Sequence, residues 1–311
     1  MRETNFLQSP AWAEFHRGLG EEVIEKKTSH YSYLAIVEHG KFSNRLYCPF
    51  GPAVDDKAAL GEAIADLKKE AQKRRLDFIR VEPTLSSLTN KDMENLGLVH
   101  SRRDVQPPHT VVNDVSVSED DIMAELSQTA RRYARKCDKA GMTYSVSYNP
   151  DDIKYFIELI HEVAERTGMK PHSDNYFKAI ATTLFPTKSA GLIFAELDGK
   201  KIASIIFYSD GRTMSYAHAA NSTEYRKISP ATGLGLYALK FAHQEGCQKF
   251  DWFGVAPAED DGNPRWKAWK GFTHFKLSYG GERVDRVGTW ELPINKLRYK
   301  IYRLALVLAH R

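Results

Sequence analysis

The stretch LIFAELDGKKIASIIFYSDGRTMSYAHA, residues 192–219, is the most informative part of the sequence for the fold. It holds three segments rich in strand-forming residues, at 192–197, 201–208 and 213–219. Asp-Gly pairs at 198–199 and 210–211 separate them, and such pairs are typical of tight hairpin turns. The sequence therefore predicts a three-stranded antiparallel meander.

A helix at 231–245 and a strand at 249–253 are predicted to follow this meander. The first half repeats the order, with predicted strands at 31–38 and 45–49, an amphipathic helix at 57–75 and a buried strand at 76–82. At 311 residues, the chain is long enough for two units of roughly 150 residues each. We expect an α/β (α+β) protein with two copies of one layout, in the order found in GNAT acyltransferase folds.

The segment between the two halves is predicted to form one helix. Ser118 is its N-cap, with an acidic residue three positions later, and the helix is expected to end at Gly141. Its inner face would carry Ile122, Leu126, Ala130, Tyr133 and Cys137. We therefore expect the domain boundary near Gly141.

Composition excludes several classes of protein. The content of 42% hydrophobic and 27% charged residues is that of an ordinary globular chain, and a net charge of +4 is too small for a protein that coats nucleic acid. Cys48, Cys137 and Cys247 lie far apart, so neither a metal site nor a disulfide framework is expected. No secretory signal or run of about 18 apolar residues is present, so we expect a cytoplasmic protein.

Two basic segments are candidates for binding nucleic acid. Arg131, Arg132, Arg135, Lys136 and Lys139 form a strip along one helix that can meet phosphate, or else a solvated face paired with acids elsewhere. The run 266–270, Trp-Lys-Ala-Trp-Lys, places Trp266 and Trp269 on one helical face beside Lys267, where the rings can stack on a base. The alternative, for Trp269 at least, is packing into the second core.

The run GFTHFKLSYGGE, residues 271–282, is interpreted as strand-like and closed by a glycine pair. It sets Lys276 beside Phe275, a fixed cation next to an aromatic wall, which suits stabilisation of an oxyanion during acyl transfer. The alternative is one core residue and one solvated residue of an alternating strand.

A phosphate-binding loop for CoA is disfavoured. Such a loop needs glycines whose backbone N–H groups face the phosphates, but the matching stretch 226–231 has Ser229 and Pro230, and proline lacks the N–H donor. Gly233 and Gly235 come later, inside the predicted helix. Acetyl-CoA is therefore not the expected donor, and no cofactor is expected.

Taken in order, LQSPAW at 7–12, LYCPFGP at 46–52, FIRVEP at 78–83 and RRYARK at 131–136, together with 271–282, resemble the Fem family of aminoacyl-tRNA-dependent peptidyltransferases. These enzymes add amino acids to the side-chain amine of peptidoglycan precursors. The resemblance runs from about Phe6 to about Tyr302 and implies two tandem GNAT-like domains. The chain resembles the shorter members of the family, because its second half lacks the insertion of 40–60 residues that would form a coiled-coil arm.

The resemblance also implies roles for residues. Lys276 matches the family lysine that steadies the tetrahedral intermediate, with Phe275 beside it, and the terminal ribose hydroxyl of the tRNA can relay the proton. The stretch 167–177 resembles the loop that holds the precursor diphosphate. Its candidate residues are Lys170, His172 and Tyr176, and His172 stands where a short member of the family has arginine. Two candidates lie elsewhere in the chain: His218 replaces a family tyrosine, and His16 stands where the family has a basic residue. Glu82 is either a proton acceptor or a cap for a neighbouring turn.

In the shorter members the C-terminal helix packs on the first domain, which implies domains at 1–141 plus 291–311 and at 142–290. The equivalent helix here, 293–308, is predicted to dock through Ile294, Leu297, Ile301, Leu304 and Leu308. Its other face carries Lys296, Arg298, Lys300, Arg303 and Arg311, so contact with an anionic membrane surface is the alternative to simple docking.

Three functions remain open at this point. The first is transfer of an amino acid from aminoacyl-tRNA to a peptidoglycan precursor, either lipid II or the UDP-linked pentapeptide. The second is a GNAT-type transfer with another acyl donor or acceptor. The third is a non-catalytic nucleic-acid-binding or scaffolding protein.

Overall fold

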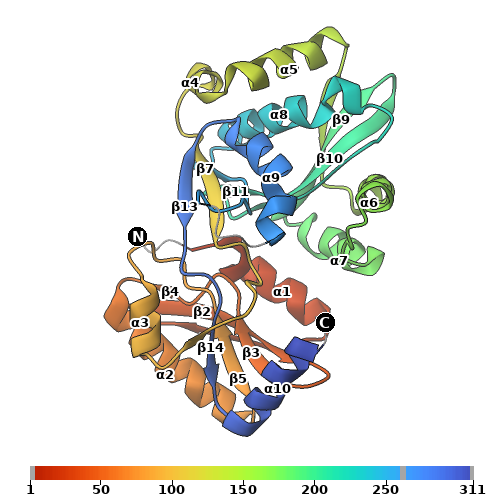
Figure 1. The fold of residues 1–311 in the computed structure, drawn as a ribbon. Helices are drawn as coiled ribbons and strands as arrows, with labels where there is room; N and C mark the ends of the chain where they lie inside the picture. The colour runs from red at the N-terminus through yellow and green to blue at the C-terminus, as the bar shows by residue number, and fades with distance from the viewer. Residues whose placement is uncertain (1–3, 260–263, 309–311) are drawn as a thin grey trace. The chain divides into compact units, whose positions relative to one another are not determined.

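The computed structural model describes residues 4–259 and 264–308 and divides into two compact units (Figure 1). Unit 1 comprises Met1–Pro108 and Asp285–Arg311, and unit 2 comprises His109–Val284. Each unit contains one mixed sheet flanked by helices, which confirms the predicted α/β class.

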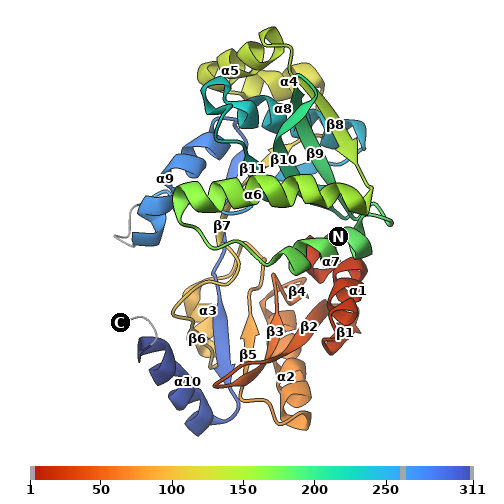
Figure 2. The same ribbon diagram turned by 90° about the vertical axis from the view of Figure 1, so that its right-hand side faces the viewer.

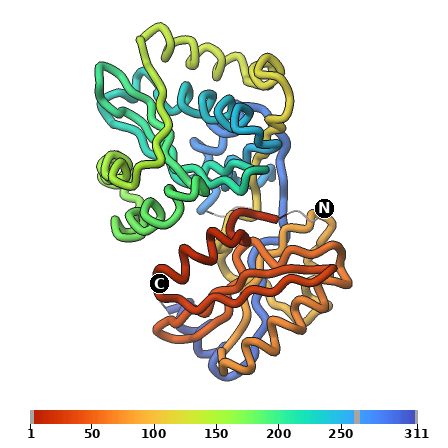
Figure 3. The backbone as a smooth tube through the Cα atoms, turned by 180° about the vertical axis from the view of Figure 1, so that it is seen from behind, coloured from red at the N-terminus to blue at the C-terminus, as the bar shows by residue number. Residues whose placement is uncertain are grey.

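The sheet of unit 1 has the order β1-β2-β3-β5-β14-β6, with β4 paired to β2. Figure 3 shows β1 to β3 side by side in red to orange. The strands are β1 (Val23–Lys27), β2 (Tyr31–His39), β3 (Asn44–Cys48), β4 (Ala53–Val54), β5 (Phe78–Val81), β6 (Val99–His100) and β14 (Trp290–Pro293). The helices are α1 (Pro10–Gly18), α2 (Lys57–Lys73), α3 (Asn90–Asn95) and α10 (Lys296–Leu308).

Alternation along β5 places helices on both faces of this sheet. Ile79 and Val81 belong to the core formed with the apolar face of α2, whereas Phe78 packs against Tyr299 and Tyr302 of α10. Successive strand residues point to opposite faces, so α2 and α10 lie on opposite sides of β5.

Ile294, which precedes α10, packs against the core of unit 1 as predicted, but the predicted packing face of α10 itself is wrong. The helix docks through its two tyrosines, while Leu297, Ile301, Leu304 and Leu308 are 69%, 51%, 64% and 71% exposed. The reason is a buried ion pair beneath the helix: Arg80 donates to the Tyr302 hydroxyl at 2.6 Å, and the Tyr299 hydroxyl donates to Glu291 at 2.7 Å. Buried charges need hydrogen-bonding partners, which leucines cannot supply. Arg311 lies outside the described residues.

The sheet of unit 2 has the order β13-β7-β12-β11-β10-β9-β8. Its strands are β7 (His109–Asp114), β8 (Thr143–Ser147), β9 (Ala190–Leu197), β10 (Lys200–Ser209), β11 (Thr213–Asn221), β12 (Lys249–Asp251) and β13 (Glu282–Asp285). Its helices are α4 (Glu119–Glu125), α5 (Gln128–Lys139), α6 (Ile153–Thr167), α7 (Asp174–Leu184), α8 (Pro230–Gln244) and α9 (Pro264–Leu277). Figure 2 shows α6 crossing in front of this sheet.

The two units repeat one motif, as the sequence predicts. In unit 1 the antiparallel strands β2 and β3 lead through α2 into β5, which pairs parallel with β3. In unit 2 the meander β9-β10-β11 leads through α8 into β12, which pairs parallel with β11.

The boundary between the units differs from the prediction at Gly141. Residues 109–141 belong to unit 2, because β7 pairs antiparallel with β12 and because residues of α4 and α5 join the core formed with α8. The single helix predicted there is two helices. Leu126 is extended, and Ser127 caps α5 while its N–H bonds to the Ser278 carbonyl, so the chain turns between α4 and α5.

The prediction of a strand at 271–282 is also wrong, because 264–277 form α9. The buried residues Trp266, Thr273 and Lys276 recur seven and three positions apart, which is helical and not strand spacing. The glycine pair Gly280–Gly281 has positive φ at both residues and connects α9 to β13. Within 4–259 and 264–308 no coiled-coil hairpin is inserted, and the longest helix, α2, has 17 residues.

Candidate active site

Lys276 is a buried lysine near the end of α9. Its side chain is almost fully enclosed, and its Nζ donates to the Gly254 carbonyl at 2.9 Å. The rings of Tyr216 and Phe272 lie 5.5 Å and 5.3 Å from that nitrogen. Among the described residues, the amine thus lies near two aromatic rings and donates to one carbonyl, which leaves capacity for further hydrogen bonds.

The position of Lys276 follows from the divergence of two parallel strands. β11 and β12 pair only from Thr213–Lys249 to Ser215–Asp251. Beyond this point the chain after β12 stays with β7, where Trp252 N–H bonds to Val111. Lys276 contacts Tyr216 on one side of this divergence and Gly254 on the other. The amine is therefore placed where the strands separate and backbone pairing has ended.

The charge state of Lys276 is finely balanced. Burial lowers the pKa of its amine to about 7, and the carboxylate of Asp251 acts in the opposite direction. Asp251 is itself buried and accepts hydrogen bonds from Phe253 N–H at 2.8 Å and from Thr110. A negative charge that develops beside Lys276 favours its cationic form, so the residue is suited to stabilise an oxyanion.

Phe275 has a different place from the one predicted. It packs edge-on against Trp252 and Tyr279, with ring centroids 6.0 Å and 5.2 Å away, as part of the unit 2 core. The aromatic rings beside the Lys276 amine are those of Tyr216 and Phe272 instead. Sequence reasoning missed Tyr216, although its position two residues before the candidate His218 was a usable signal.

A β-bulge in β11 separates Tyr216 from His218. Phe207 pairs with Tyr216 and Ile206 with His218, so Ala217 is the extra residue of the bulged strand. Tyr216 joins the core that contains Trp252, whereas His218 meets Phe177 of α7 at 5.3 Å. A bulge redirects side chains in this way.

Three of the predicted precursor-binding residues lie together on the α7 side. His172 stacks on Tyr176 at 4.2 Å and meets His218 edge-on at 5.6 Å, and the His218 Nε2 is 3.4 Å from the Tyr208 hydroxyl. We call His172, Tyr176, Tyr208 and His218 the histidine–tyrosine cluster. Burial lowers the pKa of His218 to about 3, with His172 acting in the same direction, so His218 is neutral at pH 7.

The histidine–tyrosine cluster offers ring faces and neutral polar edges. The cationic candidate of the same segment, Lys170, is exposed to solvent in the segment between α6 and α7. No group of three or more His, Cys, Asp and Glu side chains that could hold a metal ion occurs within 4–259 and 264–308.

Comparisons with known proteins bear on both the fold and the chemistry. The model of an acetyltransferase (GNAT) domain family matches residues 124–268. The lipid II:glycine glycyltransferase of Staphylococcus haemolyticus is 20% identical over 92% of this chain and 83% of its own length. That of Staphylococcus aureus strain USA300 is 19% identical over 82% and 78%. The chain is a homologue of the Fem transferases.

Solved structures support the same fold for this Fem homologue. The crystal structure of FemX superposes with a TM-score of 0.83 at 17% identity and covers 96% of this chain and 94% of its own. A tandem GNAT protein from the clavulanic acid pathway superposes with a TM-score of 0.51 at 14% identity, covering 86% and 81%. The predicted tandem GNAT-like fold and the resemblance to the Fem family are confirmed, and the Fem homologue is an enzyme of the acyltransferase or aminoacyltransferase type.

The remaining precursor candidate, His16, lies in unit 1 of the Fem homologue. Its Nδ1 is paired with the Glu21 carboxylate, and its Nε2 is buried without a hydrogen-bond partner among the described residues. Glu82, also in unit 1, is buried and accepts bonds from Tyr47, Thr289 and two backbone N–H groups. Burial raises the pKa of Glu82, and its carboxylate holds a loop together as the capping interpretation requires.

The basic strip lies on the outer face of α5 in the Fem homologue. Ala130, Ala134 and Cys137 form the buried face of this helix. The opposite side lines a surface pocket of about 510 Å³, whose residues are Arg132, Tyr133, Arg135, Lys136 and Lys139. Lys136 also donates to the Lys227 carbonyl at 2.7 Å, while Arg131 is half-buried.

The predicted stacking of Trp266 on a base is not supported, because this ring is buried. It is buried between His109 and Trp269, with ring centroids 5.8 Å and 5.1 Å away. Lys267 is exposed beside it. The bulk of an indole favours core packing over exposure, and here it closes the space between α9 and β7.

The two glycines of α8 serve packing in the Fem homologue. A Cβ on Gly233 would lie 2.0 Å from the Tyr144 hydroxyl, and one on Gly235 would lie 2.4 Å from the Tyr279 hydroxyl. Tyr279 donates to the Thr232 carbonyl at 2.8 Å, while Pro230 occupies the first turn of the helix. Aromatic rings therefore occupy the space that these glycines leave.

Proposed function

We propose that the protein transfers an amino acid from aminoacyl-tRNA to the side-chain amine of the stem peptide of a peptidoglycan precursor, forming part of an interpeptide bridge. Lys276 carries this proposal: it is a buried amine with spare hydrogen-bonding capacity at the point where β11 and β12 separate. Curated relatives named lipid II:glycine glycyltransferase support the acceptor and make glycine the first amino acid to test.

The chemistry assigned to Lys276 is stabilisation of charge. The acceptor amine attacks the carbonyl carbon of the aminoacyl ester, a C–N bond forms, and the carbonyl oxygen becomes an oxyanion. Collapse breaks the ester C–O bond, and the ribose hydroxyl leaves with the proton that the amine gives up. An aminoacyl ester is already activated, so juxtaposing the reactants and stabilising the oxyanion account for most of the catalysis needed.

We assign precursor binding to the histidine–tyrosine cluster. Its stacked His172 and Tyr176 present a ring face to a planar base or to the apolar face of a sugar. Because His218 is neutral, the cation for a diphosphate would come from Lys170, which is exposed nearby in sequence. His16 is retained as a candidate from unit 1.

We assign the tRNA to the outer face of α5, where Arg132, Arg135 and Lys139 line the surface pocket and can meet phosphates. Arg131, Lys136 and Lys267 are further candidates. Pro230 in the first turn of α8 removes a backbone donor from the place where a CoA pyrophosphate would need one, which disfavours acetyl-CoA.

The second candidate is an acyl transfer with another donor, favoured by the match of residues 124–268 to an acetyltransferase family. One assay separates the two. Purified protein is given glycyl-tRNA or acetyl-CoA, each with lipid II or the UDP-linked pentapeptide, at the cytoplasmic pH. We expect product with glycyl-tRNA only; acetylated product, or saturable micromolar binding of CoA, would overturn the proposed donor.

Truncating Tyr176 is expected to raise KM for the precursor by about 10-fold and to leave kcat within about twofold, because one stacked ring supplies binding and not chemistry. Initial rates at varied precursor concentration measure both constants. Tyr155→Ala is the control, since Tyr155 is a half-buried tyrosine of α6 outside the histidine–tyrosine cluster. A fall in kcat with unchanged KM would remove Tyr176 from the precursor site.

The pH dependence of kcat/KM is expected to bend near pH 7. Deprotonation of the acceptor amine, whose ordinary pKa is about 10.4, raises the rate tenfold per pH unit. Above pH 7 the loss of the Lys276 cation, whose pKa is about 7, offsets this gain, so the profile flattens. Lys276→Arg stays cationic, and its profile should keep rising. If log kcat/KM instead rises by two per pH unit below pH 7, Lys276 acts as a general base.

A further inference from the structure

One face of α10 is apolar and points away from unit 1. Leu297, Ile301, Leu304 and Leu308 recur every three or four residues and are each more than half exposed, from 51% to 71%. This spacing places them on one side of the helix. We call these four residues the apolar ridge.

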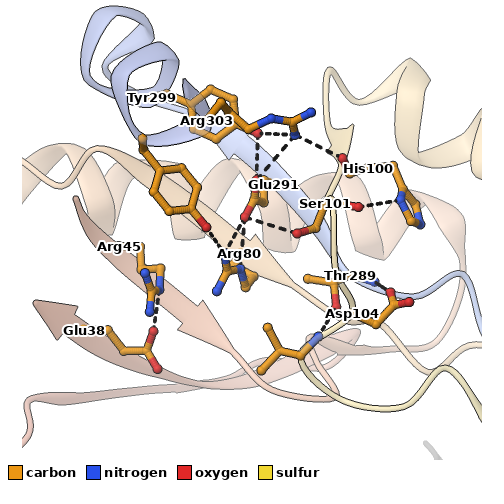
Figure 4. Close-up of polar contacts among 12 residues, drawn as sticks. Glu38, Arg45, Arg80, His100, Ser101, Asp104, Thr289, Glu291, Tyr299 and Arg303 are labelled. Atoms are coloured by element: carbon orange, nitrogen blue, oxygen red, sulfur yellow. Dashed lines mark hydrogen bonds and ion pairs between the residues drawn. The ribbon is translucent and has the colours of Figure 1, made fainter. Parts of the chain in front are cut away.

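The opposite side of α10 is firmly held, which fixes the direction of the apolar ridge. Tyr302 stacks on Phe78 with centroids 4.9 Å apart, and Tyr299 meets Phe78 edge-on at 5.3 Å. Figure 4 shows Tyr299 and Arg303 of this helix beside the Glu291 carboxylate. The tyrosines stand on the side away from the apolar ridge, so the ridge cannot turn inward without breaking these contacts.

The flanks of the apolar ridge are cationic. The helix sequence KLRYKIYRLALVL at 296–308 contains no acid. Lys296 and Lys300 lie along one flank, and Arg298 lies along the other, paired with Asp77 at 3.0 Å. Among the described residues neither lysine has an ion pair, whereas Lys26 and Lys57 of the same unit are paired with Asp66 and Asp92.

We propose that α10 docks on the surface of an anionic lipid bilayer, with the apolar ridge among the acyl chains just below the headgroups and Lys296 and Lys300 against lipid phosphates. A narrow apolar face bordered by lysines is typical of helices that lie in the membrane interface. At 13 residues the helix is too short to span, and no described helix is long and apolar enough to do so.

Charge complementarity favours the bilayer over a second copy of the chain. Two copies of α10 packed ridge to ridge about a twofold axis would bring the lysine flank of one copy near either the lysine flank or the Arg298 flank of the other, with no acid on the helix to compensate. A bilayer of anionic lipid supplies both the apolar layer and the negative charge. The inference goes beyond the proposed transfer reaction and does not depend on it.

The test is sedimentation of the full chain with large vesicles, without tRNA or precursor. One set contains phosphatidylcholine with one third phosphatidylglycerol, and the other contains phosphatidylcholine alone. We expect binding to the anionic vesicles that weakens in high salt. Leu297→Gln/Leu304→Gln and Lys296→Gln/Lys300→Gln should each weaken it by about 10-fold or more.

Matched controls come from the same unit. Phe42→Gln alters another exposed apolar residue, 51% exposed, and Lys69→Gln alters an exposed lysine of α2; both should bind as the unaltered chain does. Equal binding to both vesicle sets, no binding, or ridge variants that bind normally would overturn the proposal. A dimer in sedimentation velocity that the ridge variants abolish would overturn it in favour of a second copy.

Discussion

Lys276→Met is expected to lower the maximal transfer rate by about 10²-fold or more while precursor affinity stays nearly unchanged. The change removes the one cation held between Tyr216, Phe272 and the Gly254 carbonyl and leaves an apolar side chain of similar length. Exclusion of water strengthens the effect of one charge on an oxyanion, which is why a single substitution has this size. Single-turnover rates with saturating precursor and glycyl-tRNA provide the measurement.

The control for this substitution is Lys270→Met, because Lys270 belongs to the same helix and is exposed. It should transfer at the unaltered rate. Methionine also removes a buried charge, so Lys276→Met should fold at least as well as the unaltered chain, and circular dichroism checks this. Transfer at the normal rate by Lys276→Met would mean that the lysine is structural and that the chemistry lies elsewhere.

The repeated motif was predictable from sequence because its signals are local. Asp-Gly turns, alternating apolar residues and the 3.6-residue period of helices 57–73 and 230–244 each act within a few positions. The prediction of a strand at 271–282 was wrong for the same reason, because it used local signals alone. Its aromatic residues satisfy a strand pattern locally, whereas tertiary packing of Trp266, Thr273 and Lys276 selects a helix.

The candidate site was only partly accessible to sequence reasoning. Family resemblance supplied Lys276, His172, Tyr176 and His218, and the last three do lie together in the histidine–tyrosine cluster. The partners of Lys276 were not predictable, because Gly254 and Tyr216 meet it only through the divergence of β11 and β12. The bulge at Ala217, which sends Tyr216 and His218 to different faces, likewise has no turn signal in the sequence.

The face of α10 shows how a buried charge can override a hydrophobic pattern. The helical period of the leucines predicts that they pack inward, yet Arg80 and Glu291 under the helix require hydroxyl partners. Tyr299 and Tyr302 supply those hydroxyls together with ring surface for Phe78. The leucines are left outside, which is the origin of the apolar ridge.

Glu291→Gln is expected to destabilise unit 1 by about 3 kcal/mol, the cost of removing one partner of a buried ion pair. Glu291 Oε1 accepts from Arg80 at 2.6 Å and its Oε2 accepts from Tyr299 at 2.7 Å, with the carboxylate almost fully buried (Figure 4). Glutamine keeps the shape but leaves the Arg80 charge uncompensated. Hydrogen exchange of the β5 and β14 amides at pH 7 reports this unit separately from unit 2.

Glu38→Gln is the matched control, because Glu38 also pairs with an arginine, Arg45, but both side chains are partly exposed, at 28% and 22%. Loss of this ion pair should lower the free energy of unfolding by at most about 1 kcal/mol. The double variant Arg80→Met/Glu291→Leu removes both charges and should recover much of the stability lost in Glu291→Gln, since apolar groups can replace a buried pair. If Glu291→Gln exchanges no faster than Glu38→Gln, the ion pair is not what anchors α10, and the outward direction of the apolar ridge loses its physical cause.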